Sequence, residues 1–269
     1  MNRVTPEEAR SYYEDFASIY GSRAGFIHPN ARHERLRKGL ASVLGRRRGL
    51  GVLDVGCGTG VMTSHLRRYG TVNGMDFSAP AIEIARRMVP GVTFRVGTVT
   101  DLAPAERYDL ITLFDVVEHI PKTDRPAFFE SIAAHLAPGG FVFASTPHPR
   151  YTAWVRETKP EILQVIDELV ELEDVLVETA RAGLQLVRFE VFDVWAGSPE
   201  YQFFVLAPQT EPGGPARFVQ PPSTAARLAQ RRSPGRRRRA ALAFDLARHG
   251  RLGTARWVLS PDRRRPPQA

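Results

Sequence analysis

The chain has 269 residues with 43% hydrophobic side chains, an ordinary globular composition, and its single cysteine excludes an intrachain disulfide and a cysteine-rich zinc site. No apolar run approaches the roughly 20 residues of a membrane-spanning helix, and the charged N-terminus lacks the apolar segment of a secretory signal, so we expect a cytoplasmic protein. The net charge of +8 is concentrated in residues 209–269, which hold 14 arginines against three acids, whereas residues 1–208 carry a net charge of −3. The net charge therefore does not indicate that residues 1–208 bind nucleic acid.

Three parts follow one another along the chain. Residues 1–45 are expected to form a helical N-terminal lid with an aromatic face that includes Tyr20. Residues 46–208 form the main domain. Residues 209–269 are rich in proline and arginine, a linker composition, with a possible amphipathic helix at 240–249.

Strand and helix patterns alternate through the main domain. Short apolar or β-branched runs predict strands at 51–55, 71–75, 92–96, 108–114, 140–146, 184–192 and 201–207. Helical patterns lie at 60–69, 79–88, 126–136 and 172–182, with Ser78 as a predicted N-cap. This alternation predicts a largely parallel sheet with helices on both faces. The turn at 197–200 is too short for a crossover helix, so the last two strands should pair antiparallel.

The strongest local motif runs from Val52 to Gly60, closing the first strand and opening the first helix. Its glycines permit a tight turn and let a ligand approach the backbone. The spacing differs from the G-x-G-x-x-G of dinucleotide sites, where a pyrophosphate lies on the helix N-terminus. Asp54, just before the turn, would repel a pyrophosphate and suits a ligand with an ammonium group and no phosphate. Taken alone, the motif also fits an ordinary tight turn.

Two further acids follow the next two predicted strands. Asp76 ends the second strand, where a carboxylate can accept both hydroxyls of a ribose, and Asp101 follows the third, where it can accept an adenine amino group. Because the C-terminal ends of parallel strands meet at one edge of a sheet, we expect these acids and Asp54 to face one crevice.

These residues resemble the class I S-adenosylmethionine (SAM)-dependent methyltransferases over roughly residues 10–207. The motifs are LDVGCGTG (53–60), MDFS (75–78), YDLITLFDVVEHI (108–120) and LAPGGFVFASTPHP (136–149). They look most like the small-molecule branch around ubiquinone-biosynthesis O-methyltransferases and glycan or natural-product methyltransferases. The resemblance implies a Rossmann-like α/β fold, with a seven-stranded, mostly parallel sheet whose last strand is antiparallel. It also implies SAM as cofactor, S-adenosylhomocysteine (SAH) as product and a small-molecule acceptor.

The resemblance further implies which residues contact SAM, all of them at the C-terminal ends of the first four strands or in the lid. They are Tyr20 of the lid, Asp54, Gly56, Cys57, Gly58 and Gly60 at the methionine moiety, Asp76 at the ribose, Phe77, Val99, Thr100, Asp101 and Leu102 at the adenine, and Asp115 near the sulfonium and the acceptor.

Methyl transfer requires alignment of nucleophile, methyl carbon and sulfur, and removal of a proton if the acceptor is a hydroxyl. His119 is the candidate general base, since an imidazole titrates near neutral pH, and Asp115 is the second candidate catalytic residue. His119 could instead only cap the loop. Some relatives hold a divalent ion with a similar cluster, for which the ligands here would be Asp115, Glu118, His119 and His148. Because Asp replaces the first Glu of that pattern, we do not expect a metal.

The insertion at 147–171 is expected to shape the acceptor site. The candidate acceptor contacts are His148, Tyr151 and Trp154, with Trp195 from the turn between the last two strands. Aromatic side chains there could stack on a sugar or an aromatic acceptor, or could simply pack in a lid.

Two other functions stay open alongside methylation of a hydroxyl, amine or carbon of a small molecule. One is a nucleic-acid methyltransferase whose arginine tail binds phosphates, although no N-P-P-[YF] motif follows the fourth strand. The other is a non-catalytic protein of the same fold whose basic tail docks on an anionic surface.

Overall fold

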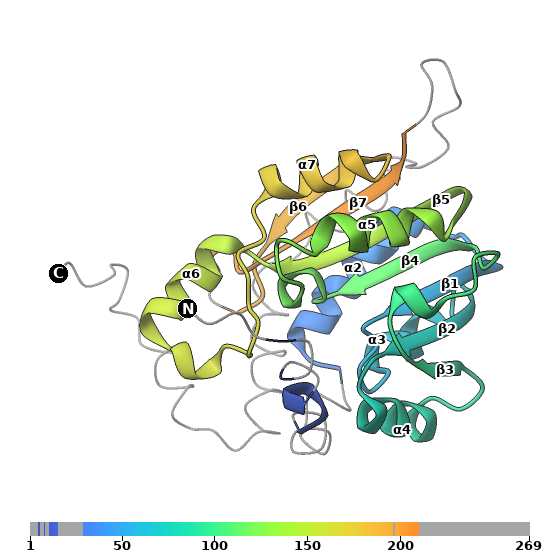
Figure 1. Ribbon diagram of the computed structural model, residues 1–269, viewed down its shortest axis with the longest axis horizontal. Helices are drawn as coiled ribbons and strands as arrows, with labels where there is room; N and C mark the ends of the chain where they lie inside the picture. The colour runs from blue at the N-terminus through green and yellow to red at the C-terminus, as the bar shows by residue number, and fades with distance from the viewer. Residues whose placement is uncertain (1–4, 6–7, 9–10, 16–28, 196, 210–269) are drawn as a thin grey trace. The chain divides into compact units, whose positions relative to one another are not determined.

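The computed structural model describes residues 5, 8, 11–15, 29–195 and 197–209 (Figure 1). The chain divides into two units, residues 1–222 and 223–269, and all described residues belong to the first. Tyr20 and the tail beyond residue 209, including the segment 240–249, lie outside the described residues. No helix in the described ranges is long and apolar enough to cross a membrane.

Seven strands form one sheet in the order β3-β2-β1-β4-β5-β7-β6. Their bounds are β1 Leu50–Val55, β2 Gly70–Asp76, β3 Thr93–Val96, β4 Tyr108–Phe114, β5 Leu136–Pro147, β6 Leu184–Phe192 and β7 Tyr201–Pro208. β7 runs antiparallel to both of its neighbours, whereas the pairs from β3 to β5 are parallel. The expected Rossmann-like α/β sheet with an antiparallel last strand is therefore confirmed.

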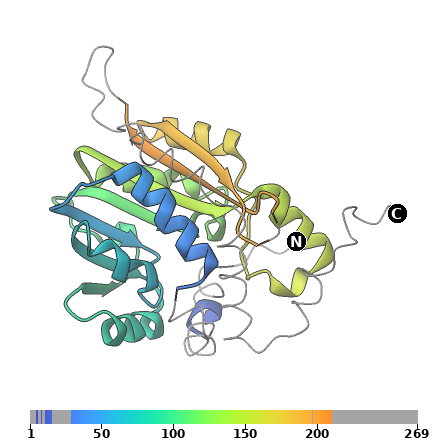
Figure 2. The ribbon, with the colours of Figure 1, turned by 180° about the vertical axis from the view of Figure 1, so that it is seen from behind.

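Helices cover both faces of this sheet. α5 (Arg125–Ala134) and α7 (Leu172–Arg181) lie on the near face in Figure 1, and α2 (Ala31–Leu44) lies on the opposite face, in front in Figure 2. α3 (Val61–Leu66) packs into the same hydrophobic cluster as α2, and α4 (Ala79–Met88) contacts β2 and β3. The insertion folds into α6 (Pro149–Thr158) and the short 3-10 helix η3 (Pro160–Ile162).

A local hydrogen bond and a strand pairing explain where α4 begins and where α5 ends. The Ser78 hydroxyl accepts from the backbone N–H of Ala81 at 3.3 Å, so the predicted N-cap of α4 is confirmed. α5 ends at Ala134, earlier than the predicted residue 136, because Leu136 already pairs with Tyr108 in the sheet. Residues 137–139, which lie between the predicted helix at 126–136 and the predicted strand at 140–146, therefore belong to β5, where Gly139 has φ 82°.

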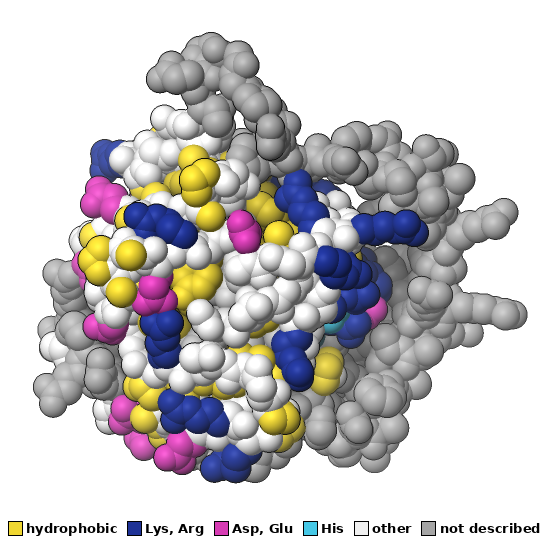
Figure 3. Space-filling model, turned by 90° about the vertical axis from the view of Figure 1, so that its right-hand side faces the viewer, with side chains coloured by type: hydrophobic (Ala, Val, Ile, Leu, Met, Phe, Trp, Pro, Cys, Tyr) yellow, Lys and Arg dark blue, Asp and Glu magenta, His cyan; other side chains and the backbone are white. Residues whose placement is uncertain are grey.

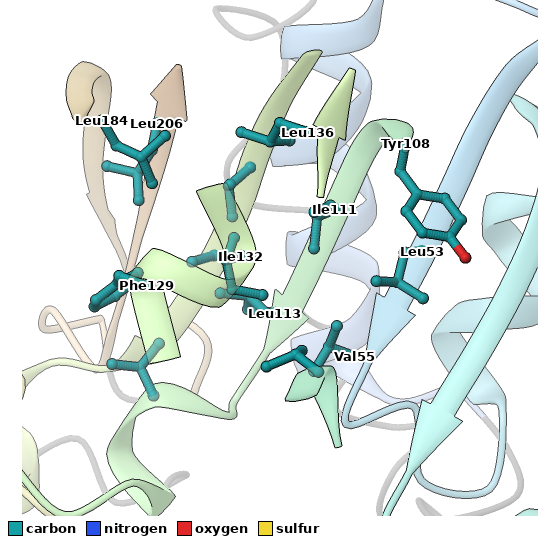
Figure 4. Packing of buried hydrophobic residues seen from close by; sticks show 14 of the residues in the cluster. Leu53, Val55, Tyr108, Ile111, Leu113, Phe129, Ile132, Leu136, Leu184 and Leu206 are labelled. Atoms are coloured by element: carbon teal, nitrogen blue, oxygen red, sulfur yellow. The ribbon is translucent and has the colours of Figure 1, made fainter. Parts of the chain in front are cut away.

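The core has two large clusters, one on each face of the sheet, and a smaller third cluster beside α4. On the α5 and α7 face, Phe129 and Ile132 of α5 pack against Ile111 and Leu113 of β4 (Figure 4). On the other face, residues of α2 such as Leu36 and Leu40 pack against β1, β5 and β7. Burial on both faces holds the strands rigidly, so the loops at their C-terminal ends start from fixed positions.

The amino-terminal edge of the sheet carries basic residues. Arg46, Arg47 and Arg48 precede β1, and Arg67 and Arg68 precede β2. Figure 3 looks onto the right-hand side of Figure 1 and shows Lys and Arg side chains there with hydrophobic and acidic side chains between them. The side of the molecule seen in Figure 3 is therefore not uniformly basic.

Candidate functional site

The loop between β1 and α3 lies where the strand order reverses, since β1 pairs with β2 on one side and β4 on the other. Gly56 has φ 65°, and a Cβ on it would lie 2.5 Å from Cγ2 of Val116, so this position requires glycine. Gly58 has φ 52°, and a Cβ there would meet no atom within 4 Å. The loop therefore packs against the segment after β4 at Gly56, and the space beside Gly58 is open.

Asp76 at the end of β2 supports this loop. Its Oδ2 accepts from the backbone N–H of Gly58 and its Oδ1 from that of Ser78, both at 2.9 Å. Burial raises the pKa of Asp76, whereas these two hydrogen bonds act to lower it. Each carboxylate oxygen keeps a second lone pair, so the group can still accept hydrogen bonds from a ligand.

The neighbouring loop after β3 is stabilised by its own acid. The backbone N–H of Thr98 donates to Oδ2 of Asp101 at 2.7 Å and closes a capping box around the 3-10 helix η1 (Val99–Asp101). Asp101 is exposed, and Val99 and Leu102 beside it are buried. Phe77, after β2, is half-buried and meets Tyr13 edge to face at 5.4 Å. An aromatic ring from the N-terminal segment therefore lies beside the expected adenine position.

Two members of the glycine-loop motif turn away from the crevice. Asp54 is 1% exposed, and its two oxygens accept from the hydroxyls of Thr63 at 2.6 Å and Thr112 at 2.7 Å. Burial raises the pKa of Asp54 to about 6. In this structure Asp54 supports the loop from below, and its expected contact with the methionine moiety stays a prediction. Cys57 likewise buries its thiol in the cluster with α4.

Asp115, directly after β4, is fixed by three hydrogen bonds from two elements, β5 and α2. It is the only non-glycine residue of the described part with a left-handed backbone, at φ 57°. Its N–H donates to the carbonyl of Ser145 at 2.9 Å, and the Ser145 hydroxyl donates to Oδ1 at 3.0 Å. Arg32 of α2 donates to Oδ2 and forms an ion pair with it. Asp115 is thereby held in a conformation that a free chain rarely adopts.

A cavity of about 200 Å³ opens beside Asp115. Its walls come from α2, the segment after β4, the insertion and the ends of β5 and β7. The lining residues are Arg32, Asp115, Glu118, His119, Pro147, Tyr151, Thr152, Val155, Ile162, Leu163, Gln164, Asp167, Trp195 and Tyr201. The cavity thus combines aromatic walls with a cluster of charged groups.

Glu118 is the most deeply buried of these acids. Glu118 is 2% exposed, and its Oε2 has no hydrogen-bond partner among the described residues. Burial, followed by the negative charges of Asp115 and Asp167, raises the pKa of Glu118 well above its usual range. The surroundings of Glu118 therefore favour the protonated form of its carboxyl more than water would.

His119, in the 3-10 helix η2 (Val117–His119), is held by the insertion. Its Nδ1 donates to the carbonyl of Ile166 at 2.7 Å, which leaves Nε2 to accept from the Gln164 amide at 3.2 Å. Its ring also lies 5.6 Å from that of Tyr13. Both ring nitrogens are occupied, so in this geometry His119 organises the cavity wall and offers no free nitrogen to an acceptor.

The structure brings only part of the predicted acceptor set together. Tyr151 and Trp195 line the cavity. His148 and Trp154 are not among its lining residues, and their role as acceptor contacts stays a prediction. His148 caps α6 by accepting from the N–H of Arg150 at 3.2 Å, and Trp154 is 43% exposed, stacking on Tyr151 at 5.9 Å.

The proposed metal ligands are also dispersed. Within the described ranges, no three His, Cys, Asp or Glu side chains are grouped so that they could hold a metal ion. Asp115 is bound to Arg32, while His119 is directed to Ile166 and His148 to the start of α6.

Sequence reasoning missed Arg32, Gln164, Asp167 and Tyr201 in the cavity and Tyr13 beside Phe77. None of them follows a strand in a recognisable motif. Arg32 comes from a helix far earlier in the chain, and Asp167 from the irregular end of the insertion. The one available signal was the aromatic pattern of the N-terminal segment, which pointed to Tyr20 while the described contact is made by Tyr13.

Comparisons with known proteins agree with this geometry. The profile of the family described as "Methyltransferase domain" matches residues 29–190. The ubiquinone biosynthesis O-methyltransferase of Vibrio vulnificus is 35% identical over 153 residues, which cover 53% of this chain and 63% of that protein, less than two thirds of its length. A DhpI–SAH complex superposes with a TM-score of 0.59 at 21% identity, covering 78% of this chain and 100% of that one. The magnesium protoporphyrin IX methyltransferase of Synechocystis with bound SAH gives a TM-score of 0.59 at 16% identity over 76% of this chain and 100% of that one. At these identities the two structures show the shared fold.

Proposed function

Because the chain belongs to the methyltransferase domain family, we propose that it transfers the methyl group of SAM to a small-molecule acceptor held in the cavity beside Asp115. The observation that carries the proposal is that the open glycine loop, Asp76 and this cavity share one edge of the sheet. Ligands of open α/β sheets bind at that edge, where the strand order reverses.

The residues present fit SAM. A Cβ at Gly58 would meet open space, and a ligand can approach the backbone there. Asp76 has acceptor capacity left for ribose hydroxyls, while Phe77, Val99, Thr100, Asp101 and Leu102 would surround the adenine. Gly56, Cys57, Gly58 and Gly60 would hold the methionine moiety through their backbone. Bound SAM supplies a methyl group on a positively charged sulfur, which is already strongly electrophilic.

The acceptor contacts follow from the cavity. Tyr151, Trp195 and Tyr201 provide aromatic walls that can stack on a planar or sugar ring. Asp115, held by Arg32 and Ser145, places a fixed negative charge where the sulfonium is expected. Residues of the insertion, including those of α6, would exclude water from the reacting atoms. A cavity of about 200 Å³ suits a small acceptor or one ring of a larger one.

The proposal is tested with the full-length chain, SAM and three acceptor probes: catechol, methyl glucoside and aniline. We expect acceptor-dependent formation of SAH, detected by mass spectrometry together with the methylated acceptor. A folded chain that binds neither SAM nor SAH would contradict the proposal, whichever acceptors are supplied.

A further inference from the structure

A cluster of basic side chains lies toward the amino-terminal edge of the sheet, opposite the edge that carries the candidate site. It consists of Arg37 of α2, Arg48 before β1, His65 in the last turn of α3 and Arg68 just after that helix, arranged around the ring of Tyr69. Figure 3 shows Lys and Arg side chains gathered on one side of this edge, with a histidine side chain among them. The three arginines and the histidine form the arginine cluster, and none of them has a role in the proposed methyl transfer.

The ring of Tyr69 holds the cluster together. The Cζ atoms of Arg48 and Arg68 each lie 5.6 Å from the centroid of this ring, and the His65 ring meets it edge to face at 6.0 Å. Burial raises the pKa of Tyr69, and the charges of the three arginines oppose this effect, so all three lie near its hydroxyl. Tyr69 is 1% exposed and therefore fixed in the core. It keeps like charges close together that freely solvated side chains would separate.

Two nitrogen atoms of the cluster are buried without a partner. Nε of Arg37 and Nε2 of His65 have no hydrogen-bond partner among the described residues. Burial, followed by the positive charges of Arg37 and Arg68, lowers the pKa of His65 to about 4. The imidazole is therefore neutral at pH 7 and can carry its proton on Nε2, where it would donate to a ligand. Two unsatisfied donors in one cluster point to an acceptor group that binds between them.

The cluster also carries more positive than negative charge. Glu34 of α2 pairs with Arg37 at 3.2 Å, but it is shared with Lys38, which lies 3.4 Å away. In the part of the chain that the structure describes, no carboxylate forms an ion pair with Arg48 or Arg68. One carboxylate therefore faces four cationic side chains, and a bound anion would offset the remaining charge.

We propose that the arginine cluster is a binding site for a phosphate group, separate from the SAM site. A guanidinium presents several N–H donors in one plane, and a phosphate offers three or more acceptor oxygens. One phosphate can therefore accept from more than one arginine and from Nε2 of His65. A phosphate monoester carries close to two negative charges at pH 7, which suits the excess of positive charge better than a single carboxylate does. The phosphate belongs either to a dissolved molecule or to a lipid headgroup, and the experiments below separate these two sources.

The site is tested by calorimetric titration of the full-length chain with pyrophosphate at constant ionic strength. The double variant Arg48→Ala/Arg68→Ala should bind about 100-fold more weakly, because each charge-assisted hydrogen bond contributes about tenfold or more. The matched control is Arg87→Ala/Arg181→Ala, which removes two exposed arginines from α4 and α7, outside the cluster. This control should bind as the wild type does, and it carries the same basic tail. Equal pyrophosphate affinity in Arg48→Ala/Arg68→Ala and the control overturns the proposal.

A second pair of substitutions separates a built site from diffuse charge. Arg48→Lys/Arg68→Lys keeps both positive charges but removes the planar set of donors. We expect this variant to bind pyrophosphate about tenfold more weakly than the wild type. Wild-type affinity would show that only the net charge matters, which overturns the assignment of a defined site.

The His65 ring gives a readout at the site itself, by NMR of its Hε1 proton, which His65→Gln identifies. The charged and titratable groups that face this ring are Glu34 and Arg37 of α2 and Arg68 and Tyr69 after α3. A bound phosphate adds negative charge and favours the imidazolium, so saturating pyrophosphate should raise the pKa of His65 from about 4 toward about 6.5. If pyrophosphate binds and leaves this pKa unchanged, it binds elsewhere, and the proposal is overturned.

Vesicles of phosphatidylcholine with and without phosphatidic acid distinguish the two sources of phosphate. Binding of pyrophosphate assigns the site to a dissolved phosphate. Binding only to vesicles with phosphatidic acid, lost in Arg48→Ala/Arg68→Ala and kept in the control, assigns it to a lipid headgroup. Binding of neither probe by the folded wild type overturns the proposal. SAM affinity should be the same in the wild type and both alanine double variants, so a failure to bind SAM concerns only the proposed function.

Discussion

Arg32, in the first turn of α2, forms an ion pair with Asp115, which lies 83 residues further along the chain at the end of β4. The side chain of Asp115 is 12% exposed and that of Arg32 is 27% exposed, so the pair is largely shielded from water. The negative charge of Asp115 raises the pKa of Arg32 against the opposing effect of burial. The pair therefore ties α2 to the residue that follows β4 at the cavity.

Arg32→Met should lower the free energy of unfolding by about 1–3 kcal/mol, because it leaves the Asp115 carboxylate without its cationic partner. Urea unfolding followed by circular dichroism measures the change. Arg35→Met is the control, since its pair with Asp193 is more exposed and should contribute less than about 1 kcal/mol. Equal changes in the free energy of unfolding would show that the Arg32–Asp115 pair stabilises the fold no more than the exposed Arg35–Asp193 pair.

His119→Ala should reduce kcat far less than the ~100-fold expected for loss of a general base, because both of its ring nitrogens bind the insertion. The loss of these contacts loosens the cavity wall, so the acceptor KM should rise. Steady-state kinetics with SAM saturating separates the two parameters. A kcat loss of two orders of magnitude at unchanged KM would restore His119 as the base.

Tyr151 and Trp154 offer a matched pair on one helix, since Tyr151 lines the cavity and Trp154 stacks on its outer side. Tyr151→Ala should raise the acceptor KM about tenfold, the scale of a lost aromatic contact. Trp154→Ala should change it only slightly. If Trp154→Ala has the larger effect, the acceptor lies outside the cavity described here.

Asp54 gives a pH-dependent prediction for stability. Burial raises its pKa from 3.8 to about 6, so the folded chain keeps this proton at pH values where the unfolded chain has lost it. Its contribution to stability is therefore full below pH 3.8 and is lost as pH rises to about 6, by up to about 3 kcal/mol. Asp54→Asn should remove this part of the pH dependence in urea unfolding at pH 4, 5, 6 and 7. Parallel curves for variant and wild type would refute the buried-carboxyl account.

Local sequence patterns predicted those features of the fold that depend on interactions between residues close together in the sequence. The bounds of α4 follow from its N-cap at Ser78 and its apolar periodicity, and the antiparallel last pair follows from a turn too short for a crossover. The start of β5 was missed because Leu136 is placed by pairing with Tyr108, a contact between distant segments. No local pattern encodes such a contact.

In the candidate site too, local sequence patterns predicted some features and could not predict others. Asp76 and Asp101 were predicted because each follows a strand of a parallel sheet, whose ends meet at one edge, and Asp115 was predicted from the family resemblance. The direction of a side chain was not predictable in that way. Asp54 turns to Thr63 and Thr112, and His119 turns to the insertion, because tertiary packing decides which partner each one meets. Arg32 could be found only once α2 was placed against the sheet.

The central claim is that SAM binds at the C-terminal edge of the sheet, with its ribose on Asp76. The most direct measurement is a calorimetric titration of SAM into the full-length wild type, Asp76→Ala and the control Asp109→Asn. Asp109 lies near the start of β4 at the opposite edge, where it accepts from the N–H of Gly51 at 2.8 Å. We predict saturable binding to the wild type and to Asp109→Asn, and a loss of about 1.5–3 kcal/mol in Asp76→Ala, the scale of charge-assisted hydrogen bonds. Undiminished affinity in a folded Asp76→Ala variant would contradict the ribose assignment, and absence of binding to the folded wild type would contradict the whole account.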